Sequence, residues 1–519
     1  MKKIIALLLV LAMSFCFFAC STNEPTPTNP DENPGENPGE NPGENPGEQP
    51  GENPGENPGE NPGENPGEQP GTNPGTNPGG STSQKVQYDV VGYDGSAVTI
   101  RFSHTMNKGY QDVLNKYIKE FNAIYPNITI EHSQVGGYDE VRDTIKTELT
   151  AGMQPHIAYC YPDHVALYNI TKKVVPLDNF INSDIVDILG GGGILGLTEE
   201  QIADFIPSYY AEGAVFDAAG TMYTLPMSKS TEVLYYNKTF FEQHNLTVPT
   251  TWEEMAAVCE QIKAIDPNCT PLGYDSEANW FITMCEQQNS PYTSSDPSSH
   301  YVFNNKYNKA FVKTFREWYQ KGWVTTKELS GAYTSGLFTA QTLYMCIGSS
   351  GGSTYQRPEA TDDGYVFDVG IAKIPQVNPA EPAAISQGPS LCIFDHENKQ
   401  EVVAAWLFVK FLTTNPQFQA EFSRVSGYMP VINSAKEIPS YKNWLAQADG
   451  GDYIQALAMT VAIEQSNAYF VSPAFNGSSE ARDQVGALMQ YCLAAVTTDV
   501  DAMIDKAFKE AVEACIEKS

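Results

Sequence analysis

Apolar and polar residues follow two rhythms along the chain from about residue 97 onward, one typical of strands and one typical of helices. The run AVTIRFS has strand character, and the segment before Pro126 repeats its apolar residues at helical spacing. These signals occur in the order strand, helix, strand, helix, strand over residues 97–103, 112–125, 128–130, 139–150 and 156–161. This order predicts a parallel sheet with helices on both of its faces.

The rest of the chain continues the alternation. A turn and two strand-like runs surround Pro226, and Thr251 and Glu254 have the spacing of a capping box at a helix start. Further strands are predicted at residues 343–347, 367–374 and 391–394, a glycine- and serine-rich loop at 348–353, and helices at 309–321, 401–412 and from about 477 to the end. Residues 85–519 can bury large cores and should form two lobes or domains.

The first 20 residues have the pattern of an export signal. Lys2 and Lys3 precede an apolar run of about 15 residues, which is short for a membrane span and typical of a signal peptide. The run ends at Ala19 and Cys20 and resembles the bacterial lipobox, in which the Cys becomes the first mature residue and carries lipid. Phe17 departs from that pattern, which prefers Leu. We expect a lipoprotein signal peptide over residues 1–20 with Cys20 as the lipid anchor, the alternative being an ordinary secretory signal.

Residues 21–84 form a second compositional block. The sequence cycles through Glu-Asn-Pro-Gly and contains 15 Pro, 13 Gly and 12 acidic residues but no Lys or Arg. A four-residue period with Pro and Gly in every unit suits neither a helix nor a sheet ladder, and the block has too few apolar side chains to form a core. We expect a disordered, solvated tether; a calcium-binding role for its Glu residues is a minor alternative.

Charge excludes one class of partner. The formal net charge is −32, and residues 85–519 keep −22 of it, from 29 basic and 51 acidic residues. Such a surface repels phosphate backbones, so nucleic-acid binding is not expected. No apolar stretch of 18 residues follows residue 20, so no later segment is expected to span a membrane.

Most motifs for catalysis and metal binding are missing. The sequence has no Walker-type phosphate loop and no His-Glu-x-x-His, and its Gly-x-Ser-x-Gly match lies within the glycine- and serine-rich run at 348–353. His156 and His164 do not belong to a His-Glu-x-x-His or Cys-x-x-Cys metal-binding motif. Acidic residues are too plentiful for a glycoside hydrolase to be excluded by counting. We expect no enzyme activity, no metal and no cofactor.

Several longer motifs together resemble a known family. They are TLPMSKSTEVLYYNKTFF (224–241), VPTTWEEM (248–255), QGPSLCIF (387–394) and AAWLFVKFLTTNPQFQAEFSRVSGYMPV (404–431). They are similar to the extracellular solute-binding proteins of bacterial ABC importers, in the carbohydrate-type cluster (family 1), and most of all to its glycerol-phosphate and sugar-binding subgroup. The resemblance covers residues 97–519. It implies an α/β, two-lobed, type II periplasmic-binding-protein fold over residues 85–519, with a mostly parallel, helix-flanked sheet in each lobe and hinge strands between the lobes.

The resemblance also implies a binding site, since the subgroup's solute contacts fall on matching positions of this chain. Carried over position by position, they are Tyr138 in GGYDE, Ser230 before VLYYN, Trp280 as a stacking platform, Ser349 or Ser350 in GSSGGS, Gly388, Tyr428 in SGYMP, and Arg482 at a helix start. Tyrosine and tryptophan rings suit the C–H faces of sugars, and an Arg could bind phosphate through two hydrogen bonds. Each residue has a plainer alternative, such as Trp280 in the core or a simple turn at residues 348–353.

One position departs from the subgroup. A Glu follows the third strand there, whereas Tyr161 is followed here by Pro162 and Asp163. Asp163 either replaces that acceptor or caps the following helix. A neutral sugar and a glycerol- or sugar-phosphate therefore both remain open as solutes.

The interpretation is that of a lipid-anchored receptor of an ABC importer, held in the cell envelope on the outer side of the cytoplasmic membrane. Its expected partners are a carbohydrate or glycerol-phosphate-type solute, the ABC permease subunits, and the membrane through Cys20. We expect a monomer. The alternative is a surface glycan-binding lipoprotein that is not coupled to a permease.

Overall fold

The computed structural model describes residues 84–294, 296, 298–470 and 474–518. These residues belong to the second of the two units into which the chain divides, Glu44–Ser519. The expected signal peptide, Cys20 and almost all of the expected tether lie outside the described residues, so their predictions stay predictions. Among the described helices, none is both long and apolar enough to cross a bilayer.

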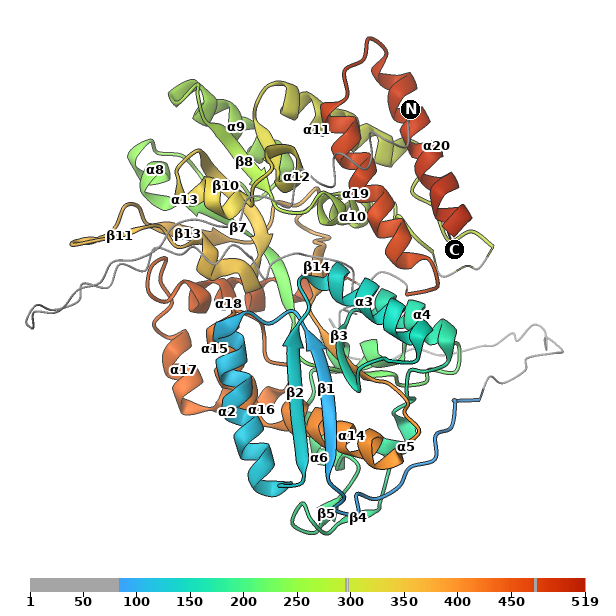
Figure 1. The fold of residues 1–519 in the computed structure, drawn as a ribbon. Helices are drawn as coiled ribbons and strands as arrows, with labels where there is room; N and C mark the ends of the chain where they lie inside the picture. The colour runs from blue at the N-terminus through green and yellow to red at the C-terminus, as the bar shows by residue number, and fades with distance from the viewer. Residues whose placement is uncertain (1–83, 295, 297, 471–473, 519) are drawn as a thin grey trace, which may run out of the picture. The chain divides into compact units, whose positions relative to one another are not determined.

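A five-stranded sheet forms the centre of the first lobe, which comprises residues 84–226 and 390–445 (Figure 1). Its order is β2-β1-β3-β15-β6. The strands are β1 (Val98–His104), β2 (Ile128–Gln134), β3 (Ile157–Cys160), β6 (Thr224–Pro226) and β15 (Ser390–Ile393). All except β15 run in one direction, since β1 is parallel to β2 and β3 while β15 is antiparallel to β3 and β6.

Helices cover both faces of this sheet. Alternate residues of β3 belong to different cores: Tyr159 packs with α2 (Lys108–Ile124) and α14 (Lys399–Thr414), and Cys160 packs with α3 (Tyr138–Ala151) and α4 (Pro162–Tyr168). The strand period of two explains this division. The remaining helices of the lobe are α5 (Asp178–Ile181), α6 (Glu199–Asp204), α7 (Pro207–Ala211), α15 (Pro416–Ser426), α16 (Asn433–Glu437) and α17 (Pro439–Leu445).

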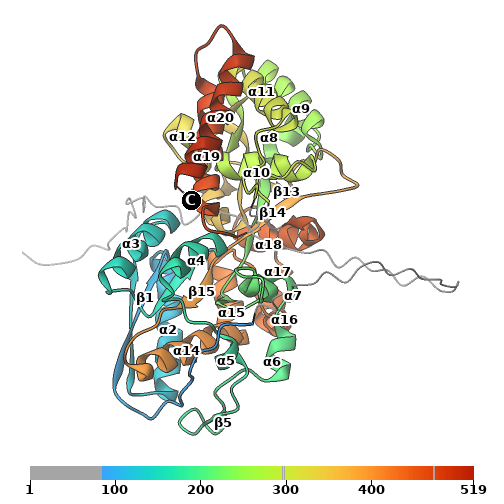
Figure 2. The ribbon, with the colours of Figure 1, turned by 90° about the vertical axis from the view of Figure 1, so that its right-hand side faces the viewer.

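A larger sheet forms the centre of the second lobe, which comprises residues 230–387, 469–470 and 478–518 (Figure 2). Its order is β16-β14-β7-β10-β8-β9, and β13 also pairs with β7. The strands are β7 (Ser230–Asn237), β8 (Thr270–Tyr274), β9 (Val324–Thr326), β10 (Leu343–Ser349), β13 (Val369–Ala372), β14 (Ala384–Gln387) and β16 (Tyr469–Phe470). Here too all strands but one, β7, run in the same direction.

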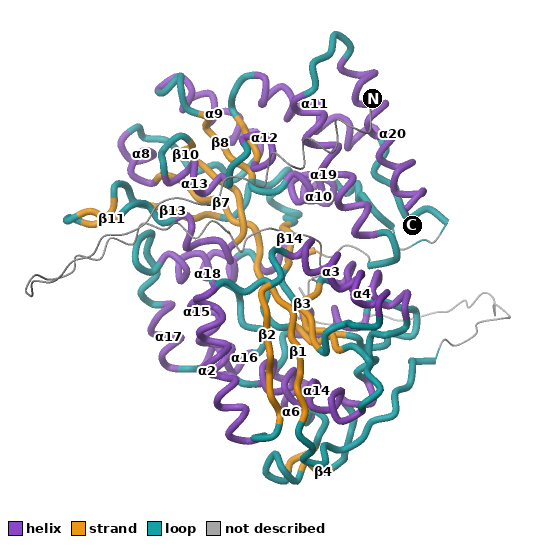
Figure 3. The backbone as a smooth tube through the Cα atoms, viewed as in Figure 1, coloured by secondary structure: helices purple, strands orange, loops and turns teal. Residues whose placement is uncertain are grey.

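Helices flank the second sheet in the same way (Figure 3). They are α8 (Lys238–Gln243), α9 (Trp252–Ile265), α10 (Glu277–Gln287), α11 (Lys306–Gln320), α12 (Lys327–Ser330), α13 (Thr334–Thr339), α19 (Ser478–Ala494) and α20 (Val500–Lys518). Helix α18 (Ile454–Glu464) contacts elements of both lobes, among them α15 and β7. The expected capping box at Thr251 and Glu254 is confirmed at the start of α9.

Two short crossings connect the lobes in the hinge, and the chain passes between the lobes a third time between α17 and α19. Residues 227–229 lead from β6 into β7, and residues 388–389 lead from β14 into β15. The two strands that run against their sheets, β7 and β15, are the ones that follow these crossings directly. A backbone bridge between Lys229 and Met429 ties the first crossing to the end of α15. The type II, two-lobed architecture with hinge strands is therefore confirmed.

Three local expectations needed correction. Helix α2 begins four residues before the predicted start because the Asn107 side chain accepts a hydrogen bond from the Tyr110 backbone N–H. The expected loop at residues 348–353 is instead the end of β10 followed by a 3₁₀ helix, Ser350–Gln356. The expected continuous C-terminal helix is two helices, because the chain leaves helical geometry at Ala495.

Candidate functional site

Buried tyrosines gather on the first lobe beside the hinge. Tyr138 is the first residue of α3, and Tyr428 follows the left-handed Gly427 that ends α15. Their hydroxyl oxygens lie 3.5 Å apart. The rings of Tyr138 and Tyr161 have centroids 4.4 Å apart, and Tyr159 stacks on Tyr138 at 6.5 Å. Burial raises the pKa of each of these phenols above its ordinary value, so they stay neutral and can donate or accept hydrogen bonds.

A narrow cavity opens among these rings. It is lined by Thr105, Met106, Tyr110, Tyr138, Tyr159, Ser228, Pro389, Phe422 and Tyr428. Ser228 and Pro389 belong to the two crossings, so the cavity reaches the hinge itself. The hydroxyls of Tyr159 and Ser228 are buried and have no hydrogen-bond partner among the described residues. Such groups are costly to leave unsatisfied. The cavity's volume of about 10 Å³ holds no more than one water molecule, so it is a candidate place for a polar solute only when the lobes are farther apart.

The second lobe contributes a buried polar network. The carboxylate of Glu232, on β7, accepts hydrogen bonds from the Tyr274 hydroxyl at 2.5 Å and the Asn279 amide at 2.9 Å. The Asn279 amide nitrogen also lies 3.3 Å from the Gln387 side-chain oxygen, and its oxygen accepts from the Arg482 guanidinium at 2.6 Å. The amide nitrogen of Gln387 is buried and has no partner among the described residues.

A larger cavity of about 390 Å³ lies beside this network. Both lobes line it, because Asp139 and Glu140 come from α3 and the other lining residues come from the second lobe. Its charged lining residues are Asp139, Glu140, Asp275, Glu277, Glu328 and Asp483 against Lys327 and Arg482. The cavity is therefore mainly acidic.

Three comparisons with known proteins bear on this arrangement. The model of the bacterial extracellular solute-binding protein family matches residues 116–448. This chain belongs to that family.

Individual relatives are distant but cover most of the chain. The sn-glycerol-3-phosphate-binding periplasmic protein UgpB of Escherichia coli is 23% identical over 379 residues, which cover 70% of this chain and 81% of the relative. UgpB of Mycobacterium tuberculosis, solved with glycerophosphocholine, has a TM-score of 0.65 at 19% identity and covers 81% of this chain and 99% of its own. A Listeria monocytogenes ABC substrate-binding protein, solved with cycloalternan, has a TM-score of 0.65 at 15% identity, with 81% and 98% covered. The family resemblance seen in the sequence is confirmed, and the protein is a solute-binding protein rather than an enzyme.

Six of the sequence-derived candidates of this solute-binding protein lie near the hinge. Tyr138 and Tyr428 line the narrow cavity, and Arg482 lines the acidic one. Ser349 and Ser350 contact the first residues of β7: the Ser349 hydroxyl donates to the Ser230 hydroxyl at 3.2 Å, and the Ser350 hydroxyl accepts from the Thr231 backbone N–H at 3.3 Å. The binding roles of these residues stay predictions.

Gly388 supports the hinge directly. Its φ is +136°, and a Cβ there would lie 2.4 Å from the Ser228 carbonyl oxygen and 2.7 Å from the Lys229 Cα. The two crossings therefore touch through their backbones at this glycine. Gly388, which the family resemblance named as a solute contact, is thus in contact with the backbone of the other hinge segment.

Asp163 and Trp280 lie farther inside the protein. Asp163 is buried in the first turn of α4, and one of its carboxylate oxygens accepts a hydrogen bond from Ser479 of the second lobe. Trp280 is 0% exposed, stacks on Tyr274 with ring centroids 5.0 Å apart and packs against Phe315 at 4.3 Å. Trp280 thus contributes to the second-lobe core and meets the polar network through Tyr274, which carries the hydroxyl bonded to Glu232.

Glu232 and Asn279 were missed by the sequence analysis. A signal for Glu232 was present, because a single acidic residue within the apolar strand STEVLYYN must find partners when the strand is buried. Asn279 has no comparable signal, since its role depends on α10 meeting β7 and α19 in space.

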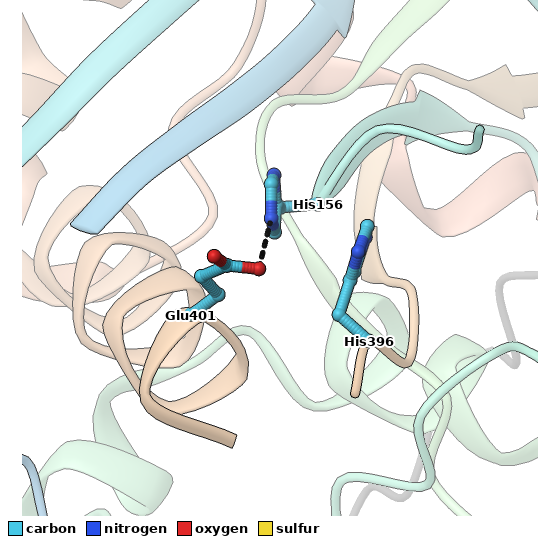
Figure 4. Close-up of side chains that lie close together, drawn as sticks. All are labelled: His156, His396 and Glu401. Atoms are coloured by element: carbon cyan, nitrogen blue, oxygen red, sulfur yellow. Dashed lines mark hydrogen bonds and ion pairs between the residues drawn. The ribbon is translucent and has the colours of Figure 1, made fainter. Parts of the chain in front are cut away.

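A second group of titratable side chains lies at the start of β3. It consists of His156, His396 and Glu401 (Figure 4). The rings of His156 and His396 stack with centroids 4.0 Å apart. His156 Nδ1 accepts from the Arg101 backbone N–H at 3.0 Å, so its Nε2 carries the proton that it donates to Glu401 at 3.2 Å. A metal could bind at His156 Nε2 only if Nε2 lost its proton while Nδ1 kept its hydrogen bond from the Arg101 backbone N–H. Hydrogen bonding accounts for this group better than metal binding does.

The buried carboxyl of Glu232 predicts a pH effect on stability. Burial raises its pKa from 4.5 to about 7 despite hydrogen bonds from Tyr274 and Asn279 and the charge of Arg482, which lower it. Because the folded pKa exceeds the unfolded one, the contribution of Glu232 is fully present below pH 4.5 and is lost as the pH rises through 7. The free energy of unfolding of Glu232→Gln relative to the wild type should therefore increase from pH 5 to pH 8 in urea titrations. A difference that stays constant with pH would contradict this.

Proposed function

We propose that this protein is the lipid-anchored receptor of an ABC importer and takes a sugar or glycerol-phosphate-type solute between its lobes for transport. Membership of the extracellular solute-binding family supports this, as do the relatives whose names or bound molecules are sn-glycerol 3-phosphate, glycerophosphocholine and cycloalternan. The observation that carries the proposal is the narrow aromatic cavity with the unsatisfied hydroxyls of Tyr159 and Ser228.

The chemistry of the proposed site suits a polyhydroxylated molecule. Tyrosine rings offer flat apolar surface to the C–H faces of a solute, and neutral phenols can donate to or accept from its hydroxyls. The buried hydroxyls and the Gln387 amide would gain the partners that they lack among the described residues. In the proposal, Tyr138, Tyr428, Ser230, Ser349, Ser350, Asp163 and Arg482 make polar contacts, Trp280 supports the wall through Tyr274, and Gly388 keeps the crossings close.

The two crossings supply a mechanism for coupling binding to shape. Residues 227–229 and 388–389 connect the lobes, and small backbone rotations there would let the lobes open and close around a solute. A permease could then recognise the closed form of the receptor. Cys20 would carry the acyl chains, and residues 21–84 would span roughly 200 Å if fully extended in polyproline form, enough to reach from a membrane.

A glycan-binding lipoprotein without a permease is the competing role. Such a protein grips polymers on an open aromatic platform, whereas the tyrosines of this site are buried beside the hinge. The burial favours a small solute held between lobes.

Thermal-shift screening tests the proposal. Neutral sugars, sugar phosphates, sn-glycerol 3-phosphate, glycerophosphocholine and soluble glycan polymers would be added to the mature protein. A solute at 100 times its dissociation constant should add about 2.7 kcal/mol to the free energy of unfolding and raise the melting temperature. A response confined to the polymers would move the assignment to the glycan-binding role, and no response to any of them would contradict both.

A further inference from the structure

Glu232 stands in the middle of the polar network and is fully buried. It is the third residue of β7, directly after the first crossing. Its two carboxylate oxygens have separate partners: one accepts from Tyr274 at 2.5 Å and the other accepts from Asn279 at 2.9 Å. These two hydrogen bonds hold the enclosed carboxylate in one orientation inside the second lobe.

Asn279 connects this carboxylate to Arg482. The amide oxygen of Asn279 accepts from the Arg482 guanidinium at 2.6 Å, and its nitrogen donates to Glu232. These two contacts fix the orientation of the amide, because only its oxygen can face a guanidinium and only its nitrogen can face a carboxylate. Arg482 therefore belongs to a buried network that already contains a carboxylate. It is the residue that sequence resemblance assigned to a solute phosphate.

The charges around Arg482 also disfavour a solute phosphate at this residue. The adjacent cavity is lined by six acidic residues, two of them from the first lobe, and by only one other basic residue, Lys327. Arg142 of the first lobe contacts Asp139, Asp143 and Asp483. A solute phosphate would reach the buried Arg482 past a cavity lining in which acidic groups outnumber basic ones. Like charges disfavour such a ligand, whereas sugar hydroxyls can pair with carboxylates, amides and the guanidinium alike.

We propose that Glu232, acting through Asn279 on Arg482, makes this receptor selective for neutral polyhydroxylated solutes over phosphate esters. This selectivity rests on the proposed receptor function and names the solute class of the same site. Glu232 serves as a specificity-determining residue because it offsets the guanidinium charge that a phosphate would need.

Calorimetric titration of matched solutes at pH 8, above the pKa of about 7 at which Glu232 loses its proton, tests the selectivity. Glucose, maltose and trehalose form the neutral set, and glucose 6-phosphate, trehalose 6-phosphate, sn-glycerol 3-phosphate and glycerophosphocholine form the phosphate set. The wild type should bind a neutral sugar most tightly. Glu232→Gln removes the charge while keeping the shape, and it should improve phosphate-ester affinity relative to neutral-sugar affinity at least tenfold.

Glu286→Gln is the matched control. Glu286 lies on α10 of the same lobe and lines a different cavity with Asn289 and Glu381, so its neutralisation changes the net charge equally without touching the network. Its ratio of phosphate to neutral affinity should stay at the wild-type value.

The possible failures are distinguishable. Tightest binding of a phosphate ester by the wild type, or an unchanged ratio in Glu232→Gln, would overturn the selectivity and leave the receptor function standing. Binding of none of the seven compounds would contradict the receptor function and the selectivity together.

Discussion

Gly388→Ala should lower the free energy of unfolding by at least about 3 kcal/mol. The backbone at Gly388 has φ +136°, which residues with a Cβ rarely adopt. The new methyl group would also lie 2.4 Å from the Ser228 carbonyl oxygen and 2.7 Å from the Lys229 Cα. Both obstacles are backbone atoms of the other crossing, so no side chain can rotate away to make room. Urea unfolding at equilibrium measures the loss.

Gly220→Ala separates the two causes of this loss. Gly220 also has a positive φ, +65°, but nothing lies within 4 Å of a Cβ there. This control should therefore lose only about 1–2 kcal/mol, the cost of the left-handed conformation alone. Equal losses in the two variants would show that the crossings are not in close backbone contact.

Lys229→Met should cost about 3–5 kcal/mol of stability. The Lys229 ammonium and the Glu212 carboxylate form an ion pair at 2.6 Å, with side chains 0% and 2% exposed. The ammonium also donates to the Gly388 carbonyl oxygen at 3.1 Å and so links one crossing to the other. Methionine fills the volume but removes the positive charge that offsets a buried carboxylate. Chemical denaturation of the purified variant measures the cost.

The double variant Lys229→Met/Glu212→Leu tests whether charge is the cause. Replacing both members of a buried ion pair with apolar residues is often far less costly than replacing one. The double variant should therefore be clearly more stable than Lys229→Met alone. If the second substitution simply adds a further loss, packing rather than electrostatics explains the effect of the first.

Local patterns in the sequence were sufficient for most of the fold. The strand run after Pro226 and the helix beginning at Thr251 appear in the structure as β7 and α9. Their signals are local: alternation of side chains, a proline, and a capping box. Trp252, Trp318 and Trp406 lie on helices and are 7%, 6% and 0% exposed. The 3₁₀ helix Ser350–Gln356 was not predicted, because its serines and glycines have only a weak local preference for any conformation. Tertiary contacts decided the conformation there.

The site was harder to predict because its groups meet only in three dimensions. Tyr138 and Tyr428 are 290 residues apart in sequence, and only the family resemblance linked them. Resemblance also named Arg482, but it could not show that Asn279 joins this cation to Glu232. The environment of Trp280 was hard to predict for the same reason. A ring on one helix could face a solute or the Phe315 side chain, and sequence spacing does not distinguish these two environments.

The central claim is that the tyrosines beside the hinge hold the solute. Calorimetric titration of Tyr138→Phe with the compound that gives the largest thermal shift tests it most directly, with Tyr307→Phe as control because Tyr307 is 55% exposed on α11. We expect one solute per wild-type chain, affinity about tenfold weaker in Tyr138→Phe through loss of one buried hydrogen bond, and wild-type affinity in Tyr307→Phe. Wild-type affinity in Tyr138→Phe would contradict the claim.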